Sequence, residues 1–429
     1  MISILSLGCS KNLVDSERLA RRFADAGLEV RFTDALEADG SQYIINTCGF
    51  IGDAKEESIG LLLEAIELRK QGGISGVYGM GCLTERYRAE LKEEMPELDG
   101  IYGKFDWGAL VDDLASKTPV TRPWQRSLST APHYTYLKIS EGCNRFCAFC
   151  AIPLITGRHH SRPVDEILEE VRELVAKGVR EYNIIAQDLS SYGRDLDGGV
   201  SRLAELLELM AAVEGVEMIR LHYAYPSDFP FDILPVMAAH SNICKYLDIA
   251  LQHIDNKVLD NMRRHIDADA TRSLLARIRH EVPGIHIRTT MMVGFPGEDD
   301  EAFNHLVEFV EEQRFERLGA FAYCEEEGTF AANNLPDIVP EDVKKQRLDR
   351  LMEVQQDIAF DTASAKIGST LRVIIDEYDG ERYIGRTEYD SPEVDCCVFI
   401  DSSRPLTTGN IYNIEITDAE GFDLIGHVS

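Results

Sequence analysis

The sequence predicts an α/β protein in three folded parts: an N-terminal open parallel α/β sheet, a central partial barrel of six βα units, and a C-terminal small antiparallel β-barrel. Apolar runs alternate with helical patterns up to about residue 325, which predicts parallel sheets. Beyond residue 365, short alternating segments between turns predict antiparallel strands. We expect domains at residues 1–115, 133–365 and 366–429, with a proline-containing linker at 116–132.

The first domain shows three strand-then-helix units. Buried strands are predicted at residues 2–7, 43–46 and 76–80. The helix after the second strand is supported by apolar residues at the spacing of one helix face. These residues are Ile59, Leu62, Leu63 and Ile66.

A cysteine follows each of these three strands: Cys9, Cys48 and Cys82. The carboxyl ends of parallel strands line one edge of an open α/β sheet, so we expect the three thiols to converge there. A single cysteine near a strand end is usually a small buried apolar residue. Three at the same topological position, two of them preceded by glycine, make a metal site plausible.

The central domain repeats the strand–helix alternation with longer units, and six parallel strands joined by right-handed crossovers predict a partial barrel. The strands are predicted at residues 134–139, 181–186, 218–223, 246–250, 286–293 and 317–323.

The densest motif follows the first of these strands: Cys143, Cys147 and Cys150, spaced C-x-x-x-C-x-x-C. Three thiolates suit iron, and they leave one iron of a four-iron cluster without a protein ligand. A zinc site is the alternative, but it needs a fourth ligand, and the nearest are His159 and His160 in a predicted loop. Disulfides are not expected, because the chain shows no signal peptide and the cysteine pattern fits a reducing cytoplasm.

Further polar residues follow later strands of the barrel, where barrel enzymes bind their ligands. They are Gln187-Asp188, Gln252-His253 and the turn Gly294-Phe295-Pro296-Gly297-Glu298. Each motif alone is weak evidence for a ligand site, because such a turn often has no further role and a histidine at a strand end is often structural.

A long helix is predicted at residues 341–365, with Leu348, Leu351, Val354 and Ile358 on its apolar stripe. After it, strands at 371–376, 382–387, 394–400 and 411–416 predict a five-stranded small barrel of the oligomer-binding shape. Cys396 and Cys397 are placed on the third of these strands, facing opposite ways. We expect Cys244 and Cys324 to be ordinary core thiols.

Composition narrows the class of partner. No run approaches eighteen apolar residues, so no membrane contact is expected. The net charge of −30 disfavours a nucleic-acid partner and suits a basic protein, although a simple acidic surface explains the charge equally well.

The segment from Tyr136 through Cys150 to Ser161-Arg162-Pro163 resembles the radical S-adenosylmethionine (SAM) motif of the methylthiotransferases. The loop at 152–160 departs from the usual family pattern, which leaves its substrate contacts open. Further matches cover all three domains, and the last domain is similar to a TRAM domain. The matches are Leu7-Gly8-Cys9-Ser10-Lys11-Asn12, Asn46-Thr47-Cys48-Gly49-Phe50, Gly81-Cys82-Leu83, Gln187-Asp188 with Ser191-Tyr192-Gly193, Leu251-Gln252-His253 and residues 293–298.

The resemblance implies two 4Fe-4S clusters. Cys143, Cys147 and Cys150 would hold the cluster whose open iron binds SAM and cleaves it to a 5'-deoxyadenosyl radical. Cys9, Cys48 and Cys82 would hold the cluster that carries the sulfur, and a second SAM would supply the methyl group. Phe149, Gln187, Gln252, Gly294 and Glu298 would contact the cofactor, Phe149 beside the adenine unless it is a plain apolar filler. No catalytic acid or base is assigned.

The family includes enzymes for two kinds of substrate. The resemblance is strongest to the branch that modifies the β-carbon of an aspartate in the twelfth protein of the small ribosomal subunit; the alternative is a tRNA adenosine methylthiotransferase of the MiaB type. Residues 366–429 contain thirteen acidic and five basic residues, a net charge of −8. Such a domain would repel tRNA phosphates and attract a basic ribosomal protein.

Two further expectations complete the hypothesis. The resemblance implies an electron donor such as flavodoxin or ferredoxin, in the cytoplasm. A non-enzymatic alternative is an iron–sulfur scaffold or redox sensor that uses the same six thiols.

Overall fold

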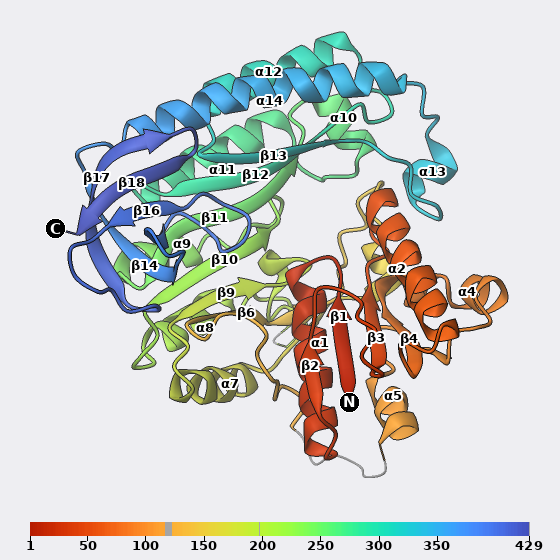
Figure 1. The fold of residues 1–429 in the computed structure, drawn as a ribbon. Helices are drawn as coiled ribbons and strands as arrows, with labels where there is room; N and C mark the ends of the chain where they lie inside the picture. The colour runs from red at the N-terminus through yellow and green to blue at the C-terminus, as the bar shows by residue number, and fades with distance from the viewer. Residues whose placement is uncertain (116–121, 197, 429) are drawn as a thin grey trace. The chain divides into compact units, whose positions relative to one another are not determined.

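The structure, a computed structural model, describes residues 1–115, 122–196 and 198–428. Contacts divide the chain into two compact units, which we describe separately (Figure 1). The first unit contains Met1–Thr130, Glu141–Asn144 and Cys150–His160, and the second contains Ala131–Ser140, Arg145–Phe149 and Ser161–Ser429. Residues 116–121 of the predicted linker lie outside the described residues.

The first unit contains a five-stranded parallel sheet in the order β2-β1-β3-β4-β5. The predicted strands are β1 (Ile2–Ser6), β3 (Gln42–Thr47) and β4 (Gly76–Gly81), and prediction missed the short edge strands β2 (Val30–Phe32) and β5 (Gly100–Ile101). The helices are α1 (Ser10–Asp25), α2 (Gly52–Lys70), α3 (Cys82–Arg86), α4 (Arg88–Glu94), α5 (Trp107–Leu114) and α6 (Ile152–Thr156).

Both faces of this sheet are covered, as a parallel sheet requires. Tyr43 and Ile45 of β3 face a core that includes Leu62 and Ile66 of α2. Ile44, the residue between them, faces the opposite core, which α1 and α5 complete. Leu63 of the predicted apolar stripe is exposed, and Ala65 occupies the buried face of α2 instead.

The second unit contains a six-stranded parallel sheet in the order β13-β12-β11-β10-β9-β6. Because β6 and β13 are its outer strands, the predicted six-unit barrel is partial, and this fold class is confirmed. The strands are β6 (Tyr134–Lys138), β9 (Glu181–Ile185), β10 (Met218–Ala224), β11 (Ile243–Gln252), β12 (His286–Val293) and β13 (Arg317–Ala322), with the short strands β7 (Ser140–Glu141) and β8 (His160–Ser161) where the chain passes between the units.

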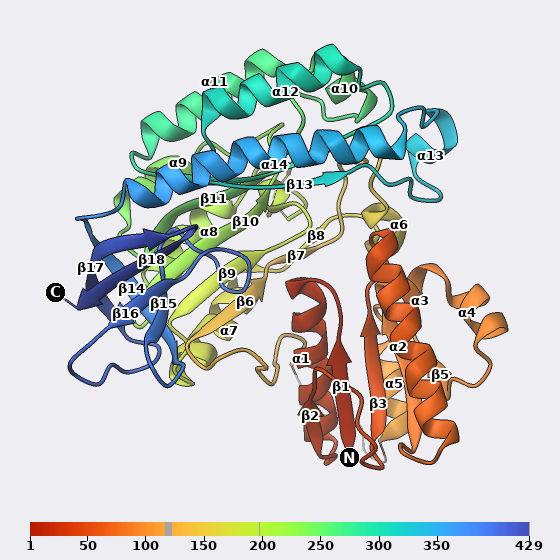
Figure 2. The ribbon, with the colours of Figure 1, turned by 45° about the horizontal axis from the view of Figure 1, so that its top comes forward.

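Helices cover the outer face of this sheet, and Figures 1 and 2 show α12 and α14 running along β12 and β13. The predicted long helix is α14 (Glu341–Ser364), which buries Leu351, Val354 and Ile358. The other helices are α7 (Val164–Ala176), η1 (Leu189–Ser191), α8 (Leu203–Ala211), α9 (Ile233–Ala239), α10 (Asn256–Asn261), α11 (Ala268–Glu281), α12 (Asp300–Gln313) and α13 (Phe330–Asn334).

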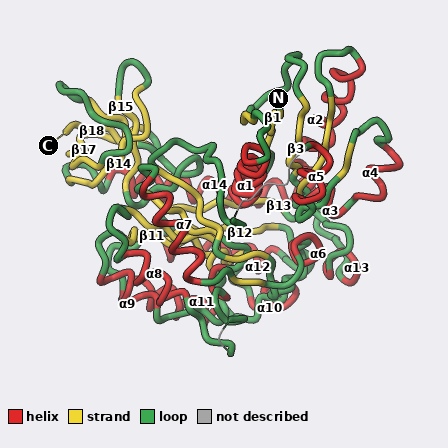
Figure 3. The backbone as a smooth tube through the Cα atoms, turned by 90° about the horizontal axis from the view of Figure 1, so that it is seen from below, coloured by secondary structure: helices red, strands yellow, loops and turns green. Residues whose placement is uncertain are grey.

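The C-terminal strands form the predicted five-stranded barrel, which is closed, in the order β14-β15-β16-β18-β17, and they gather as one group of yellow strands in Figure 3. The pairing of β16 with β18, a strand that prediction missed, is parallel, and the other pairings are antiparallel as predicted. One boundary was wrong: β16 begins at Val398, so Cys396 and Cys397 precede it. Residues 392–395 form a turn whose Asp395 amide donates to the Ser391 carbonyl, which ends strand pairing there. The strands are β14 (Thr370–Tyr378), β15 (Tyr383–Thr387), β16 (Val398–Asp401), β17 (Ile411–Glu420) and β18 (Asp423–Val428).

Buried charges join this small barrel to the central sheet within the second unit. Arg386 donates to both oxygens of Glu181 at 2.9 and 2.7 Å, and Arg317 donates to Asp390 at 2.5 Å. Tyr246 donates to Asp395 at 2.9 Å. Part of the negative charge of the small barrel is therefore used internally and is not displayed to a partner.

None of the helices in residues 1–115, 122–196 and 198–428 combines the length and the apolar composition that a membrane span requires.

Candidate metal and cofactor site

The three cysteines that follow β1, β3 and β4 lie in one unit at the carboxyl edge of one sheet, as predicted. Cys9 precedes the first residue of α1, Cys82 is the first residue of α3, and Cys48 directly follows β3. Cys9 is exposed, Cys82 is half-buried and Cys48 is buried.

Two glycines let the cysteine loops approach one another. A Cβ atom at Gly8 would lie 2.8 Å from the Sγ of Cys48, and one at Gly49 would lie 2.7 Å from the Cα of Leu83. Gly8 also has φ +85°, which favours glycine. The loops of Cys9, Cys48 and Cys82 therefore pack together through positions where a side chain does not fit.

Asn12 ties these loops to one another. Its side-chain amide donates to the carbonyls of Leu7 and Thr47, each at 3.1 Å. Its carbonyl oxygen lies 3.4 Å from the Sγ of Cys82. One side chain of α1 thus contacts all three cysteine loops, which fits a site assembled from all of them.

The thiols influence one another electrostatically. The pKa of Cys82 is raised to about 12, chiefly by burial; Lys104 opposes the rise, and the neighbouring Cys9 and Cys48 add to it. Desolvation would raise the pKa of Cys9 as well, but Lys11, the amide of Asn12 and Lys104 together lower it. Among the described residues, no three His, Cys, Asp or Glu side chains converge closely enough for one metal ion. A cluster is larger, because each of its thiolates binds a different iron.

A buried cation lies beside this site. The Nζ of Lys104 is 2.6 Å from Asp15 and 3.9 Å from Glu141, and its side chain is only 2% exposed. Burial would lower the pKa of Lys104, but Asp15 and Glu141 raise it well above its ordinary value, so it stays charged. Prediction missed Lys104 and Asp15, because they are 89 positions apart in the sequence and a single charged residue gives no periodic signal.

The loop that carries Cys143, Cys147 and Cys150 is divided by its contacts. Cys143 and Cys150 belong to the first unit, and Cys147 belongs to the second. Their joint binding of a cluster therefore stays a prediction from the spacing of three thiols within eight residues. Gly142 has φ +78°, and a Cβ there would lie 2.1 Å from the carbonyl oxygen of Arg158, so this turn requires glycine.

The second unit holds the middle of the loop firmly. The amide of Ala148 donates to the carbonyl of Met262, and the carbonyl of Ala148 accepts from Ala331. Arg145 donates to the buried Asp188 at 2.7 Å. Asp188, predicted with Gln187 as a candidate ligand contact, thus acts on the loop through Arg145, while Gln187 beside it is half-buried.

Gln252 has the features of a ligand contact. It ends β11, is 7% exposed, and has φ +73°, a strained value for a residue other than glycine. Its side-chain oxygen is buried and has no hydrogen-bond partner among the described residues. A polar ligand such as SAM would satisfy this oxygen, which fits the predicted role.

The turn after β12 is built around Glu298, whose side chain is fully buried. Its carboxylate accepts from the Gly294 amide at 2.9 Å and from Arg347 at 2.7 Å, and it lies 3.2 Å from His253. The protein already engages both oxygens, so Glu298 shapes the turn, and its cofactor contact stays a prediction. Gly294 has φ +72°, and a Cβ there would lie 2.3 Å from Lys344.

Phe149 is half-buried and packs edge-on against Phe295, with 6.1 Å between ring centroids. Phe295 packs in the same way against Tyr323. This places Phe149 at the edge of an aromatic cluster, and its contact with an adenine stays a prediction. Of the other cysteines, Cys244 is buried as predicted, but Cys324 is exposed because it follows the end of β13.

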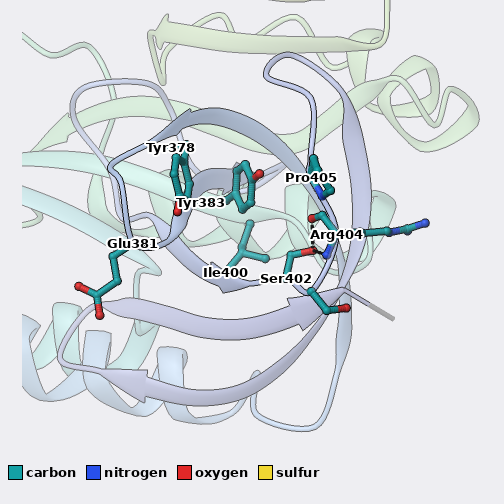
Figure 4. Close-up of a pocket in the computed structure, with 8 residues that line it drawn as sticks. Tyr378, Glu381, Tyr383, Ile400, Ser402, Arg404 and Pro405 are labelled. Atoms are coloured by element: carbon teal, nitrogen blue, oxygen red, sulfur yellow. Dashed lines mark hydrogen bonds between the residues drawn. The ribbon is translucent and has the colours of Figure 1, made fainter.

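A separate recess of about 200 Å³ lies on the small barrel. Figure 4 shows Tyr378 and Tyr383 side by side in it, while Glu381 and Arg404 extend to opposite sides. The two rings are 4.7 Å apart between centroids, and Tyr378 is 54% exposed. The recess offers an aromatic surface and carries no cysteine.

Comparison with known families accounts for most of the chain. Residues 1–103 match the family described as Uncharacterized protein family UPF0004. Residues 137–310 match the Radical SAM superfamily, and residues 367–428 match the TRAM domain. The solved radical SAM methyltransferase TsrM from Kitasatospora setae has the same fold, with a TM-score of 0.55 and 15% identity, covering 75% of this chain and 74% of TsrM.

Curated relatives match over the full length. The ribosomal protein uS12 methylthiotransferase RimO of Parabacteroides distasonis is 51% identical over 427 residues, covering 100% of this chain and 98% of the relative. The protein of the same name from Bacteroides thetaiotaomicron is 52% identical over 428 residues, with 100% and 98% covered. The chain therefore belongs to the RimO family of radical SAM methylthiotransferases.

Proposed function

We propose that this chain inserts a methylthio group at the β-carbon of an aspartate in ribosomal protein uS12. The observation that carries the proposal is the gathering of Cys9, Cys48 and Cys82 at one sheet edge, in a chain that holds a second three-cysteine set within eight residues. Two such sets suit two 4Fe-4S clusters, each with one iron that no cysteine binds.

When bound, the clusters and SAM supply the electron, the radical, the sulfur and the methyl group that no protein side chain supplies. The role of the polypeptide is to bind the clusters and SAM. Cys143, Cys147 and Cys150 would bind one cluster, and Cys9, Cys48 and Cys82 the other. Gln252 would orient the cofactor through its buried oxygen, and Glu298 would fix the turn beside it.

The choice of uS12 rests on the names of the relatives and on the surface of the small barrel. Of its acidic residues that do not bond to the central sheet, seven are exposed in residues 366–428: Glu377, Asp379, Glu381, Asp401, Glu415, Asp418 and Glu420. Only two basic residues, Arg372 and Arg404, are exposed in the same range. This surface suits a basic protein, and the recess of Tyr378 and Tyr383 suits a cationic side chain. It disfavours a tRNA substrate.

The enzymatic activity is tested with anaerobically reconstituted protein, dithionite and SAM. The proposal predicts release of 5'-deoxyadenosine and, with purified uS12, a methylthio mass on one aspartate. Unfractionated tRNA is the competing substrate. Intact clusters without 5'-deoxyadenosine would indicate a scaffold or sensor instead, and modification of tRNA alone would reject the choice of uS12.

The role of the barrel surface is tested by charge neutralisation. The variant Glu377→Gln, Asp379→Asn, Glu381→Gln should weaken uS12 binding, and its affinity should depend less on salt, while 5'-deoxyadenosine release is unchanged. The matched control neutralises exposed carboxylates of α12: Glu301→Gln, Glu308→Gln, Glu311→Gln. Equal affinities in the two variants would show that the barrel is not the docking surface. Deleting the barrel is a poorer test, because Glu181 would lose Arg386.

Two cellular features belong to the same proposal. A ribosomal protein substrate places the enzyme in the cytoplasm. A low-potential carrier such as flavodoxin or ferredoxin would deliver the electron to the cluster.

A further inference from the structure

The sulfur of Cys147 lies in a buried polar environment that the function described above does not use. The Nη1 of Arg264 is 3.2 Å from the Sγ of Cys147, and the hydroxyl of Tyr225 is 3.3 Å from it. Cys147, Tyr225 and Arg264 are 9%, 6% and 2% exposed. All three belong to the second unit, so this geometry does not depend on the first.

The ring of Tyr225 is enclosed by two cations. The guanidinium of Arg264 lies 4.1 Å from the ring centroid, and that of Arg145 lies 4.3 Å from it. Arg145 is neutralised by Asp188 at 2.7 Å and Asp228 at 2.9 Å. Both guanidinium groups therefore pack against the Tyr225 ring, whose hydroxyl lies 3.3 Å from the sulfur. That hydroxyl has one proton, which it can donate to the carbonyl oxygen of Arg264 at 3.3 Å or to the sulfur of Cys147 at 3.3 Å; a thiolate at Cys147 is the charged acceptor of the two.

Arg264 differs from Arg145 in its charge balance. Its guanidinium donates to the sulfur of Cys147 and to the carbonyl of Ala250, and in the described part of the chain it forms no ion pair with a carboxylate. Its Nε is buried without a hydrogen-bond partner among the same residues. A buried cation without a counter-charge is costly, so this position favours an anion at Cys147.

We propose that Arg264 and Tyr225 are positioning residues that hydrogen-bond the Cys147 thiolate and make reduction of the cluster bound there easier. The proposal rests on Cys147 being a cluster ligand. Hydrogen bonds and positive charge at a ligand sulfur stabilise the more negative, reduced state of an iron–sulfur cluster, which raises its reduction potential. Arg264 supplies both the charge and a hydrogen bond, and Tyr225 supplies a hydrogen bond alone.

The test is a dithionite titration of the full-length chain followed by electron paramagnetic resonance. Cys9→Ala, Cys48→Ala and Cys82→Ala are included so that the signal comes from the loop cluster alone. Arg264→Met should make reduction at least about tenfold less favourable, a shift of about 59 mV to more negative potential. Arg264→Lys should recover part of the shift, and Tyr225→Phe should shift the potential in the same direction by less.

Two controls separate tuning of the cluster from a structural effect. Arg279→Met removes the Arg279–Glu316 ion pair, 2.7 Å long, near the amino end of β12, and should leave the potential unchanged. Tyr182→Phe removes a buried hydroxyl that donates to the carbonyl of Val171 at 3.2 Å, and it should also leave the reduction potential unchanged. If Arg264→Met does not retain a cluster, Tyr225→Phe decides the question against Tyr182→Phe.

Unchanged potentials in Arg264→Met and Tyr225→Phe would overturn the inference and leave the proposed function intact. If the parent chain without Cys9, Cys48 and Cys82 assembled no cluster, the assignment of Cys147 as a ligand would fail first. The two failures are therefore distinguishable before any variant of Arg264 is made.

Discussion

Arg386 of the small barrel and Glu181 of the central sheet form a bidentate ion pair, buried and 205 positions apart in the sequence. Glu181 also accepts from Arg220, whose side chain is fully buried. The pair holds the small barrel against the central sheet, together with the bonds of Arg317 to Asp390 and of Tyr246 to Asp395. It also explains why part of the negative charge of the chain is structural.

Breaking this pair should be costly. Arg386→Met leaves the Glu181 carboxylate with less of its buried compensation, and we expect the free energy of unfolding to fall by about 3–5 kcal/mol. Urea unfolding of the full chain measures it. Arg404→Met, at an exposed position of the same barrel, should change stability by less than about 0.5 kcal/mol. Equal losses in the two variants would contradict the structural role of the pair.

The same network predicts an acid sensitivity. Burial alone would raise the pKa of Glu181 and Asp390, but Arg386 and Arg220 lower the first to about 2, and Arg317 and Lys366 lower the second to about 2. Carboxyl groups of the unfolded chain have pKa values of about 4. The contribution of Glu181 and Asp390 to stability is therefore present above that pH and is lost as the pH falls toward 2. For Glu181 the loss is on the order of 3 kcal/mol.

Urea unfolding of the cluster-free chain between pH 7 and pH 3 tests this sensitivity. Glu181→Gln should show a shallower decline of stability with acid than the parent, since an amide does not titrate. Glu301→Gln, at an exposed carboxyl, should decline as the parent does. A parent and a Glu181→Gln variant with the same pH slope would show that Glu181 is not the titrating group.

The sequence predicted the parts of the site that follow a repeated rule. Cys9, Cys48 and Cys82 each follow a buried strand, so the topology of a parallel sheet brought them to one edge. Lys104 and Arg264 carry no such signal, because their partners lie far away in the sequence and neither residue belongs to a repeated pattern. Asp390 lies between two predicted strands and Asp395 within the predicted strand 394–400, and neither position indicated the buried bonds to Arg317 and Tyr246.

Lys104 and Asp15 should be coupled. Lys104→Met leaves Asp15 buried without its cation beside the three cysteines, and we expect less iron in the first unit and a loss of about 3–5 kcal/mol. Adding Asp15→Asn removes the unpaired charge and should recover part of both losses. Lys70→Met breaks an exposed ion pair with Glu97 in the same unit and should change iron content and stability very little. Additive losses in the double variant would rule out the coupling.

Gln252 allows a test that separates backbone strain from ligand binding. Gln252→Gly relieves the strain of φ +73°, so stability should hold or rise by up to about 1 kcal/mol, whereas SAM should bind about tenfold more weakly. Equilibrium dialysis of reconstituted protein measures the binding. Arg314→Gly relieves a similar strain at φ +47° on the surface and should leave SAM binding unchanged. Unaltered SAM affinity in Gln252→Gly would remove Gln252 from the cofactor site.

The central claim is the identity of the substrate, and mass spectrometry of uS12 and tRNA from cells that lack this gene tests it most directly. The account predicts that one aspartate of uS12 loses its methylthio group while the methylthiolated nucleosides of tRNA are unchanged. Complementation with the wild-type gene should restore the uS12 mass, and the Cys147→Ala variant should not. An unchanged uS12, or a loss of methylthio groups from tRNA instead, would contradict it.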